Sequence, residues 1–328
     1  MLTGKELILA TKPFAKEIRW KSWYYTITSL LLLIGTIAGT MYFDHIALRV
    51  LCSVGAAMLL SRFFIIFHDY QHHTILRGSP IADIIFTAFG VYMITPPNIW
   101  KRSHDHHHNN NAKLFSASIG SFPIMTKQKF LEASKRERFE YLAVRHPINM
   151  LFAYFTTFMY GMCVQSFMSS PRRHWDSLAV LIFHFTVATL LVVYFGWFTW
   201  FLTFFVPFFL SHMLGAYLFY AQHNFPGVTF KKNADWSYTN AALESSSFMD
   251  LNPFMQWVTA NIGFHHIHHL NSKIPFYRLP EAMAAIPELQ EAKVTTLKPT
   301  DIASCLRLKV WDAEQNKMIG FDELQAMV

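Results

Sequence analysis

The sequence predicts an all-α integral membrane protein with four transmembrane helices, arranged as two hairpins, plus interfacial helices and a cytosolic helical cap. Three observations carry this prediction. Of 328 residues, 52% are hydrophobic and only 15% are charged, whereas a soluble chain scatters charges over its whole surface. Several apolar runs are long enough to cross the roughly 30 Å hydrocarbon layer. Basic residues flank these runs unevenly, which orients them.

The first predicted hairpin covers residues 23–67. Trp23 to Tyr42 contains no charged residue and forms the first span. Ile46 to Arg62 forms the second span, and the same helix could continue outward through "FFIIFHDYQHH". That continuation would deliver His68 and His72 just outside the lipid.

The second predicted hairpin covers residues 178–220. This stretch has no Asp, Glu, Lys or Arg and is divided near Gly196, which is typical of two helices joined by a tight turn. Two other apolar stretches, Ile81 to Pro97 and Ile148 to Met168, have basic residues on both sides. The positive-inside rule therefore places both stretches in the interface or in re-entrant segments.

With four crossings, every Lys and Arg except Arg49 falls on the cytoplasmic side, and so do both termini. The excess charge of +7 is compatible with an anionic cytoplasmic leaflet. No Lys/Arg stripe with interleaved aromatics stands out on a polar face, so nucleic acid is not an expected partner. Within one domain, 1–328, the remaining segments are an interfacial N-terminal segment at 1–22, a cytosolic and interfacial part at 68–177, a cytosolic cap at 221–290 and a C-terminal tail at 291–328. In the tail, "LRLKVWDAEQNKMIGF" alternates and then turns, which predicts a small hairpin.

Three histidine clusters stand out, and the topology puts all of them on the cytoplasmic side. They are "HDYQHH" with His68 and His72, "WKRSHDHHHNNN" with His104, His107 and His108, and "HHIHHL" with His265, His268 and His269. Spacings of three and four residues put imidazoles on one helical face, within reach of a metal ion.

A lone histidine pair is more often structural than a metal site. Three clusters at matched spacing argue against chance, and a purification tag would be contiguous and terminal. Ligation without cysteine disfavours a structural zinc site, and eight histidines exceed the four ligands of one tetrahedral ion. The cap is therefore expected to hold a histidine-rich dimetal site. Imidazole suits Fe, Zn, Cu and Ni, so residue type alone leaves the metal open.

At these residues the chain resembles the membrane-bound fatty acid desaturases, a family of diiron enzymes with three histidine boxes. The run "LFYAQHNFPG" supplies His223, which matches the isolated histidine that these enzymes place after the last span. The resemblance extends from about Phe64 to Leu279. The short first box, and "HHIHHL" followed by "IPFY", look most like the acyl-lipid branch of the omega-6/delta-12 type.

The resemblance implies two Fe ions held by nine histidines, with O₂ as co-substrate and no catalytic residue beyond the ligands. These histidines are His68, His72, His104, His107, His108, His223, His265, His268 and His269. The sequence departs from the family pattern at His73, which leaves His72 and His73 as alternatives, and helical geometry favours His72. Six further residues could orient the ligands or be ordinary caps and surface groups: Asp69, His73, Asp105, His106, Asn261 and His266.

The implied reaction is the O₂-dependent insertion of a cis double bond into an acyl chain carried by a lipid or a thioester. An unactivated C–H bond requires a strong metal-oxygen oxidant. Two electrons would come from an external donor, such as a ferredoxin or a small cytochrome with its reductase, because no fused redox domain is visible. Five aromatic residues near the boxes could line an acyl tunnel or belong to the ordinary core: Phe63, Phe64, Trp100, Trp257 and Phe264.

Two alternatives remain open at this point. One keeps the scaffold and changes the product, as in a hydroxylase or a carotenoid oxygenase of the same superfamily. The other is a metal-binding or metal-transport membrane protein, which should place ionisable residues along a path through the bilayer. The last two spans contain only His184 and His212, for which helix packing or a local hydrogen bond is the expected role.

Overall fold

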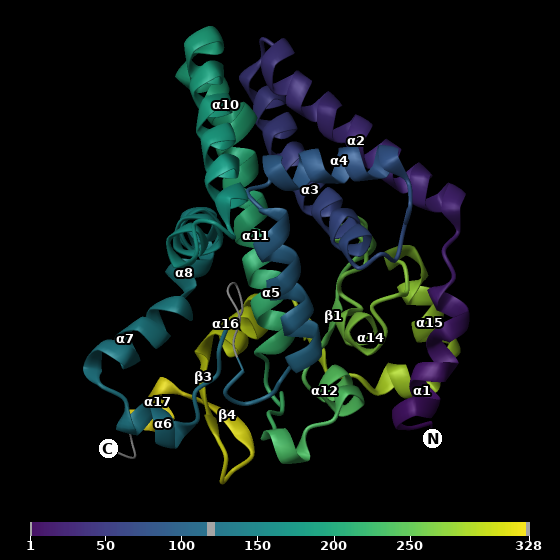
Figure 1. Cartoon of the computed structure of the whole chain (residues 1–328), viewed down its shortest axis with the longest axis vertical. Coiled ribbons are helices and arrows are strands. Elements are labelled where there is room, and N and C mark those ends of the chain that lie inside the picture. Colours follow the sequence, from purple (N-terminus) through teal and green to yellow (C-terminus); the bar gives the residue numbers. More distant parts are fainter. Residues whose placement is uncertain (1, 117–121, 326–328) are drawn as a thin grey trace.

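The structure is a computed structural model that describes residues 2–116 and 122–325. Long helices extend from one side of a cap built from short helices and loops (Figure 1). Three helical stretches within the described residues are long and apolar enough to cross a membrane: α2 (Arg19–Tyr42), α3 (Ile46–Gln71) and the stretch Trp175–His223. The predicted apolar runs are therefore helical, and α3 does continue past Arg62 as expected.

The stretch Trp175–His223 comprises α10 (Trp175–Trp200), the π-helical η3 (Phe201–Phe205) and α11 (Val206–His223). It breaks at Gly196, where φ is 81° and ψ is 158°. Only glycine adopts this region readily, because a Cβ atom would clash with the backbone. The chain turns back there, so η3 packs against α10 and α11 continues toward the cap (Figure 1). The division that the sequence predicted is confirmed. The count of four crossings stays a proposal.

Polar side chains join the two hairpins near their outer ends. Thr40 Oγ1 lies 2.6 Å from Thr203 Oγ1, and Ser53 Oγ donates to the Leu202 carbonyl at 2.6 Å. Arg49 Nη2 donates to Thr199 Oγ1 at 3.0 Å. In lipid each unsatisfied polar group costs several kcal/mol, so these bonds hold α2 and α3 against the turn between α10 and α11.

The two stretches that the sequence assigned to the interface form bent or short elements. Helix α4 (Pro80–Tyr92) and α5 (Pro97–Asn110) meet at an angle of 92°, which is the geometry of a broken span or a re-entrant loop. The second stretch forms α8 (Pro147–Leu151) and a π-helix, η2 (Tyr154–Gln165). Phe63 of α3 packs on Phe86 and Phe89 of α4, with ring centroids 5.7 and 4.7 Å apart. This contact holds the C-terminal half of α3 against α4.

The cap contains the remaining elements of the described chain. The helices are α1 (Gly4–Thr11), η1 (Lys12–Ala15), α6 (Lys127–Glu132), α7 (Lys135–Val144), η4 (Asn233–Asp235), α12 (Tyr238–Glu244), α13 (Pro253–Val258), α14 (His265–Leu270), η5 (Phe276–Arg278), α15 (Leu279–Ala285), η6 (Pro287–Glu291), α16 (Pro299–Arg307) and α17 (Phe321–Gln325). Helix α9 (Ser166–Ser169) instead continues η2 directly. The N-terminal α1 lies against the cap in Figure 1, and Asn271 Nδ2 donates to Thr11 Oγ1 at 2.8 Å.

The fold is mainly helical, and it also contains two small sheets, which corrects the all-α prediction. Strands β3 (Leu308–Asp312) and β4 (Lys317–Gly320) pair antiparallel, so the predicted C-terminal hairpin is confirmed. Strands β1 (Phe248–Asp250) and β2 (Val294–Thr296) pair in parallel, with Met249 opposite Thr295. Three residues are too few to leave an alternating pattern in the sequence, so the sequence did not predict this second sheet.

Candidate metal centre

Nine histidines converge where the long helices meet the cap. Four segments deliver them: the end of α3, helix α5, the end of α11 and helix α14. Since α3 and α11 run together toward the cap, their last turns bring His68 and His223 to the level of α14. The nine are those that the resemblance implied, and the structure brings them together as two groups.

The first group contains five histidines: His68, His72, His104, His108 and His268. Its imidazoles face one another through Nε2. His104 Nε2 lies 2.8 Å from His68 Nε2 and 3.0 Å from His72 Nε2. His108 Nε2 lies 3.1 Å from both His104 Nε2 and His268 Nε2.

The second group contains four histidines: His107, His223, His265 and His269. His107 Nε2 lies 3.1 Å from His223 Nε2 and 3.2 Å from His269 Nε2. His265 Nε2 lies 2.9 Å from His223 Nε2. The two groups adjoin, since the rings of His108 and His269 stack with centroids 4.3 Å apart.

Each pair spaced by four residues shares a group, and in α5 and α14 the third histidine of the cluster goes to the other group. In α5, His104 and His108 join the first group while His107 joins the second. In α14 the arrangement is reversed, because the pair His265 and His269 joins the second group and His268 the first. The sequence had put each cluster on one helical face. The structure instead uses two adjoining faces, since residues four apart are nearly in line along a helix and a residue three away is rotated from them.

The donor set fits metal ions. Two nitrogens bound to one ion at about 2.1 Å and at right angles lie about 3 Å apart, which matches the spacings within both groups. A metal-binding imidazole must also be neutral. Burial, and then the neighbouring histidines, hold the pKa values of His265, His268 and His269 well below the ordinary range. The rings of α14 are therefore neutral donors at physiological pH.

Contacts to the outer ring nitrogens orient some of the histidines. His223 Nδ1 lies 3.1 Å from the Ser245 carbonyl, to which it can donate. Asp69 Oδ1 lies 3.4 Å from His68 Nδ1, and Asp69 Oδ2 accepts from the Phe276 amide at 2.7 Å. Asp69 is thus placed to orient an imidazole, as the sequence suggested. It also ties α3 to η5.

The structure separates His72 from His73. His72 is buried and belongs to the first group, whereas His73 is exposed and outside both groups. His73 has a φ of 55°, so the chain leaves the α3 helix there and the His73 ring does not follow its face. The geometry favours His72, in agreement with the helical argument.

Four of the other residues that could orient ligands lie elsewhere. Asp105 Oδ2 pairs with Lys101 Nζ at 2.8 Å, and His106 Nε2 lies 3.0 Å from Ser116 Oγ. Asn261 Nδ2 donates to the Phe276 carbonyl at 3.1 Å, and His266 Nε2 lies 3.0 Å from the Leu289 carbonyl. None of these contacts reaches a histidine of either group. His106 and His266 point away because they occupy the opposite sides of their helices.

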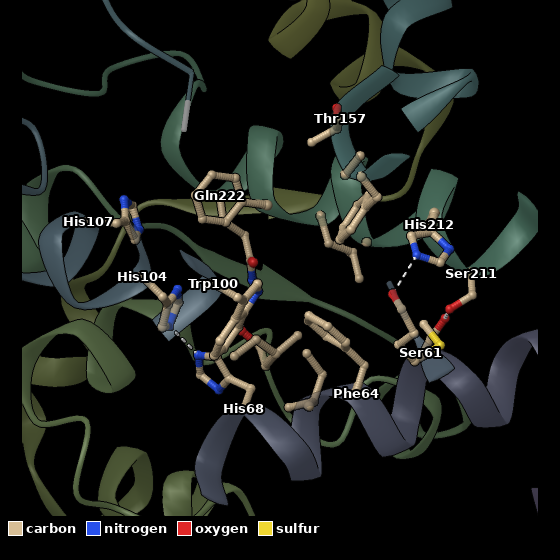
Figure 2. A pocket seen from close by; sticks show the side chains of 18 of the residues that line it. Ser61, Phe64, His68, Trp100, His104, His107, Thr157, Ser211, His212 and Gln222 are labelled. Atoms are coloured by element: carbon tan, nitrogen blue, oxygen red, sulfur yellow. Dashed lines mark hydrogen bonds between the residues drawn. The ribbon is translucent and has the colours of Figure 1, made fainter. Parts of the chain in front are cut away.

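An apolar cavity adjoins both groups (Figure 2). His68, His104, His107 and His265 contribute to its wall. Phe64 and Trp100 line it, as two of the five aromatic candidates. Phe63, Trp257 and Phe264 do not appear in its lining. The sequence did not identify several other lining residues, since they are small or polar positions inside apolar runs: Ser61, Thr157, Ser211, Gly215 and Gln222. Phe219 also lines the cavity, and nothing in its run distinguishes it from its apolar neighbours.

The part of this cavity farthest from His104 and His107 is lined by polar groups that hydrogen-bond (Figure 2). Ser61 Oγ of α3 donates to Ser211 Oγ of α11 at 3.1 Å. His212 Nδ1 and Nε2 lie 2.7 and 3.2 Å from the carbonyls of Phe208 and Met93. Outside the lining of this cavity, His184 Nε2 lies 2.6 Å from the Tyr154 hydroxyl. Helix packing or a local hydrogen bond was the expected role of His184 and His212, and both residues make such hydrogen-bond contacts outside the two histidine groups.

The long apolar helices and the paired histidine groups define a class of protein: a membrane-associated enzyme with two adjoining histidine groups that could hold metal ions beside an apolar cavity. The model of the family described as "Fatty acid desaturase" matches residues 44–299. The chain belongs to the fatty acid desaturase family, and it is an oxidoreductase of the desaturase type.

Individual relatives agree with this assignment. A fatty acid desaturase of Bacillus subtilis is 31% identical over 274 residues, which cover 82% of this chain and 76% of the relative. The chloroplastic omega-6 fatty acid desaturase of Spinacia oleracea is 24% identical, over 70% of this chain and 51% of its own length. The sn-1 acyl-lipid omega-3 desaturase (ferredoxin) of Nostoc is 23% identical, over 68% of this chain and 63% of its own length. The omega-6 relatives support the branch that the short first box indicated.

Proposed function

We propose that this protein is an O₂-dependent diiron desaturase that inserts a cis double bond into an acyl chain. One observation carries the proposal: two histidine groups lie side by side, and both border the same apolar cavity. An acyl chain in that cavity would pass both metal positions. Water would be largely excluded, because the lining is predominantly apolar.

The five histidines of the first group would hold one iron ion and the four of the second group would hold the other. When bound, the two ions supply the oxidising chemistry that no side chain can provide for an unactivated C–H bond. The protein's own residues hold the ions and orient the chain. Overall, two hydrogen atoms leave adjacent carbons, and O₂ accepts them with two electrons and two protons to give two water molecules.

The two electrons would come from an external donor, such as a ferredoxin or a small cytochrome with its reductase. The name of the Nostoc relative includes a ferredoxin, which supports the first of these donors. The substrate would be the acyl chain of a membrane lipid or of a thioester.

The four crossings would leave both termini and the metal centre on the cytoplasmic side. The distribution of basic residues supports this orientation, since Arg49 is the one Lys or Arg expected on the other side. Single cysteines introduced at Asp44 and at Asp235 test it. A membrane-impermeant thiol reagent added to intact cells should label the first position and spare the second.

Product analysis tests the function. Host cells that express the wild type together with a suitable donor should contain a new cis-unsaturated fatty acid, located by mass spectrometry of its methyl ester. His268→Ala should abolish it, while His266→Ala, on the same helix and outside both groups, should retain it. A hydroxylated acyl chain or an oxidised carotenoid would favour the other members of the superfamily. Saturable metal uptake by vesicles, without any acyl product, would favour a transporter.

A further inference from the structure

Two aromatic residues at the surface of the cap contact both histidine-bearing helices of that region. Trp236, between η4 and α12, is half-buried, and its Nε1 donates to the Asn111 carbonyl at the end of α5 at 2.8 Å. Tyr238, at the start of α12, donates its hydroxyl to the His269 carbonyl at 2.6 Å. The two rings lie 6.5 Å apart, centroid to centroid. The surface is thus connected by a short route to a histidine of the second group.

One lysine packs on Trp236, and two more lie on the segment paired with it. Lys113 Nζ lies 4.2 Å from the centre of the Trp236 ring. Lys231 forms an isolated parallel β-bridge with Lys113 and is exposed, as is Lys232 next to it. The acidic side chains on the same segment are Asp235 and Glu244, and both are exposed. Thr229 Oγ1 donates to Glu244 Oε2 at 3.1 Å. The three lysines outnumber these two carboxylates, so the patch is positive on balance.

Membrane topology alone does not account for this cluster. Figure 1 shows α12, with the loop that precedes it, at the end of the molecule opposite to the tips of α2 and α10. The positive-inside effect acts near the membrane-spanning ends, and attraction to anionic lipid falls off within a Debye length of about 10 Å. A positive patch at the far pole instead matches an acidic partner that arrives from the cytosol.

We propose that Lys113, Lys231 and Lys232 form the docking surface for an acidic one-electron carrier protein, and that Trp236 and Tyr238 lead its electrons to the second histidine group. This inference rests on the proposed function, because desaturation consumes two electrons per double bond. The carrier class is a small acidic iron–sulfur protein. Each docking oxidises its cluster by one electron and transfers that electron to the metal centre, so two dockings supply one turnover.

Binding of the carrier tests the docking surface without reference to turnover. The probe is an oxidised acidic [2Fe–2S] ferredoxin, and its association with the detergent-solubilised, iron-loaded protein is followed by biolayer interferometry at increasing salt. Reversal of Lys113, Lys231 and Lys232 to Glu should slow association at least about tenfold at low ionic strength and remove most of its salt dependence. Reversal of Lys5, Lys135 and Lys298, which are exposed lysines outside the patch, alters net charge equally and should leave association near wild type.

Equal effects of the two triple variants would overturn the docking surface. The docking surface would also be overturned if the patch variant bound ferredoxin as the wild type does and lost binding only to anionic lipid vesicles. That result would make the patch a membrane-binding surface.

Reduction kinetics test the route. Trp236→Leu should slow reduction of the iron-loaded protein by the reduced ferredoxin several-fold, and Trp236→Phe should slow it less because a ring remains. Tyr238→Phe, which lacks the bond to His269, should also slow it. Reduction by dithionite with a small mediator should be unchanged in all three variants, and so should iron content. The route would be overturned if a variant slowed reduction by ferredoxin and by dithionite equally, or if Leu and Phe at Trp236 had equal effects. Trp236 and Tyr238 would then only stabilise the ends of the helices that they contact. A wild type that binds and accepts electrons without forming unsaturated product would overturn the proposed function while leaving this inference in place.

Discussion

The Nε2 atoms of His104 and His68 lie 2.8 Å apart, although the two residues are 36 positions apart and belong to helices α5 and α3. Two neutral imidazoles meet at this distance favourably only when one donates to the other or both bind a cation. His104 has further Nε2 neighbours in His72 and His108, and one ring nitrogen cannot satisfy three partners through a single proton. A bound cation satisfies all of them at once.

The assignment of histidines to two ions predicts how the metal content of variants changes. His268→Ala removes a member of the first group, so we expect it to bind less iron than the wild type and to form no product. His266→Ala should keep its iron, and it should lose about 1–3 kcal/mol of stability because the Leu289 carbonyl loses its partner. Iron assays and thermal unfolding of both purified variants measure this. Equal iron content in the two variants would contradict the grouping.

The first box offers a sharper comparison between neighbours. His72→Ala should abolish desaturation and lower iron content, because His72 Nε2 lies among the first group. His73→Ala should retain most of both, since its ring is exposed and outside the groups. Fatty-acid profiles and iron assays of the two variants in the same host decide the matter. The reverse result would make His73 the ligand.

The pH dependence of the metal-free protein follows from the buried histidines. In the folded state the pKa values of His265, His268 and His269 are well below 6.5, so an unfolded chain binds more protons once the pH falls below about 6.5. Stability of the metal-free protein should therefore be full above that pH and decline below it. Iron binding to the neutral rings should offset the decline. Thermal unfolding at pH 7.5 and pH 5.5, with and without iron, measures both effects. A metal-free protein that is equally stable at the two pH values would contradict the neutral state of the cluster.

Gly215 lines the apolar cavity, and a Cβ atom at this position would meet nothing within 4 Å. A leucine there should occupy cavity space without a backbone clash. We expect Gly215→Leu to shift the product profile toward shorter acyl chains while iron content stays at the wild-type level. Gly35→Leu is a matched control, because Gly35 also has open space around it and lies on α2, outside the cavity. An unchanged chain-length profile in Gly215→Leu would show that the substrate does not occupy this part of the cavity.

Gly196 allows a test of the turn between α10 and α11. Its φ of 81° and ψ of 158° are open almost only to glycine, so Gly196→Ala should cost about 1–3 kcal/mol. Gly215→Ala, with no positive φ, should cost less than this. Thermal unfolding in one detergent compares the two variants. Equal losses would show that the turn at Gly196 relaxes without strain.

Much of the fold and of the site could be predicted from the sequence, because local chemistry leaves a direct mark there. Charge-free runs such as Trp23 to Tyr42 can satisfy their backbone in lipid only as helices, and the structure has a helix there. Gly196 was recognised as a break because few other signals interrupt so long an apolar run. The nine histidines were recognised by their spacing and by the family resemblance, and the structure gathers the same nine.

The division of these histidines between two groups could not be predicted, since it depends on how separate helices approach each other. Helical periodicity relates His104 to His107 and His108 within α5, but it does not determine which of them faces α3 and which faces α11. The contact of Asp69 with the Phe276 amide, the hydrogen bond between Ser61 and Ser211 in the cavity wall, and the contact of Tyr238 with His269 likewise join segments far apart in the chain. The sequence by itself determined which residues bear the chemistry and on which helices they lie. Only the tertiary structure decided which of them meet, because the packing of α3, α5, α11 and α14 is set by the sum of many nonlocal contacts rather than by any local pattern.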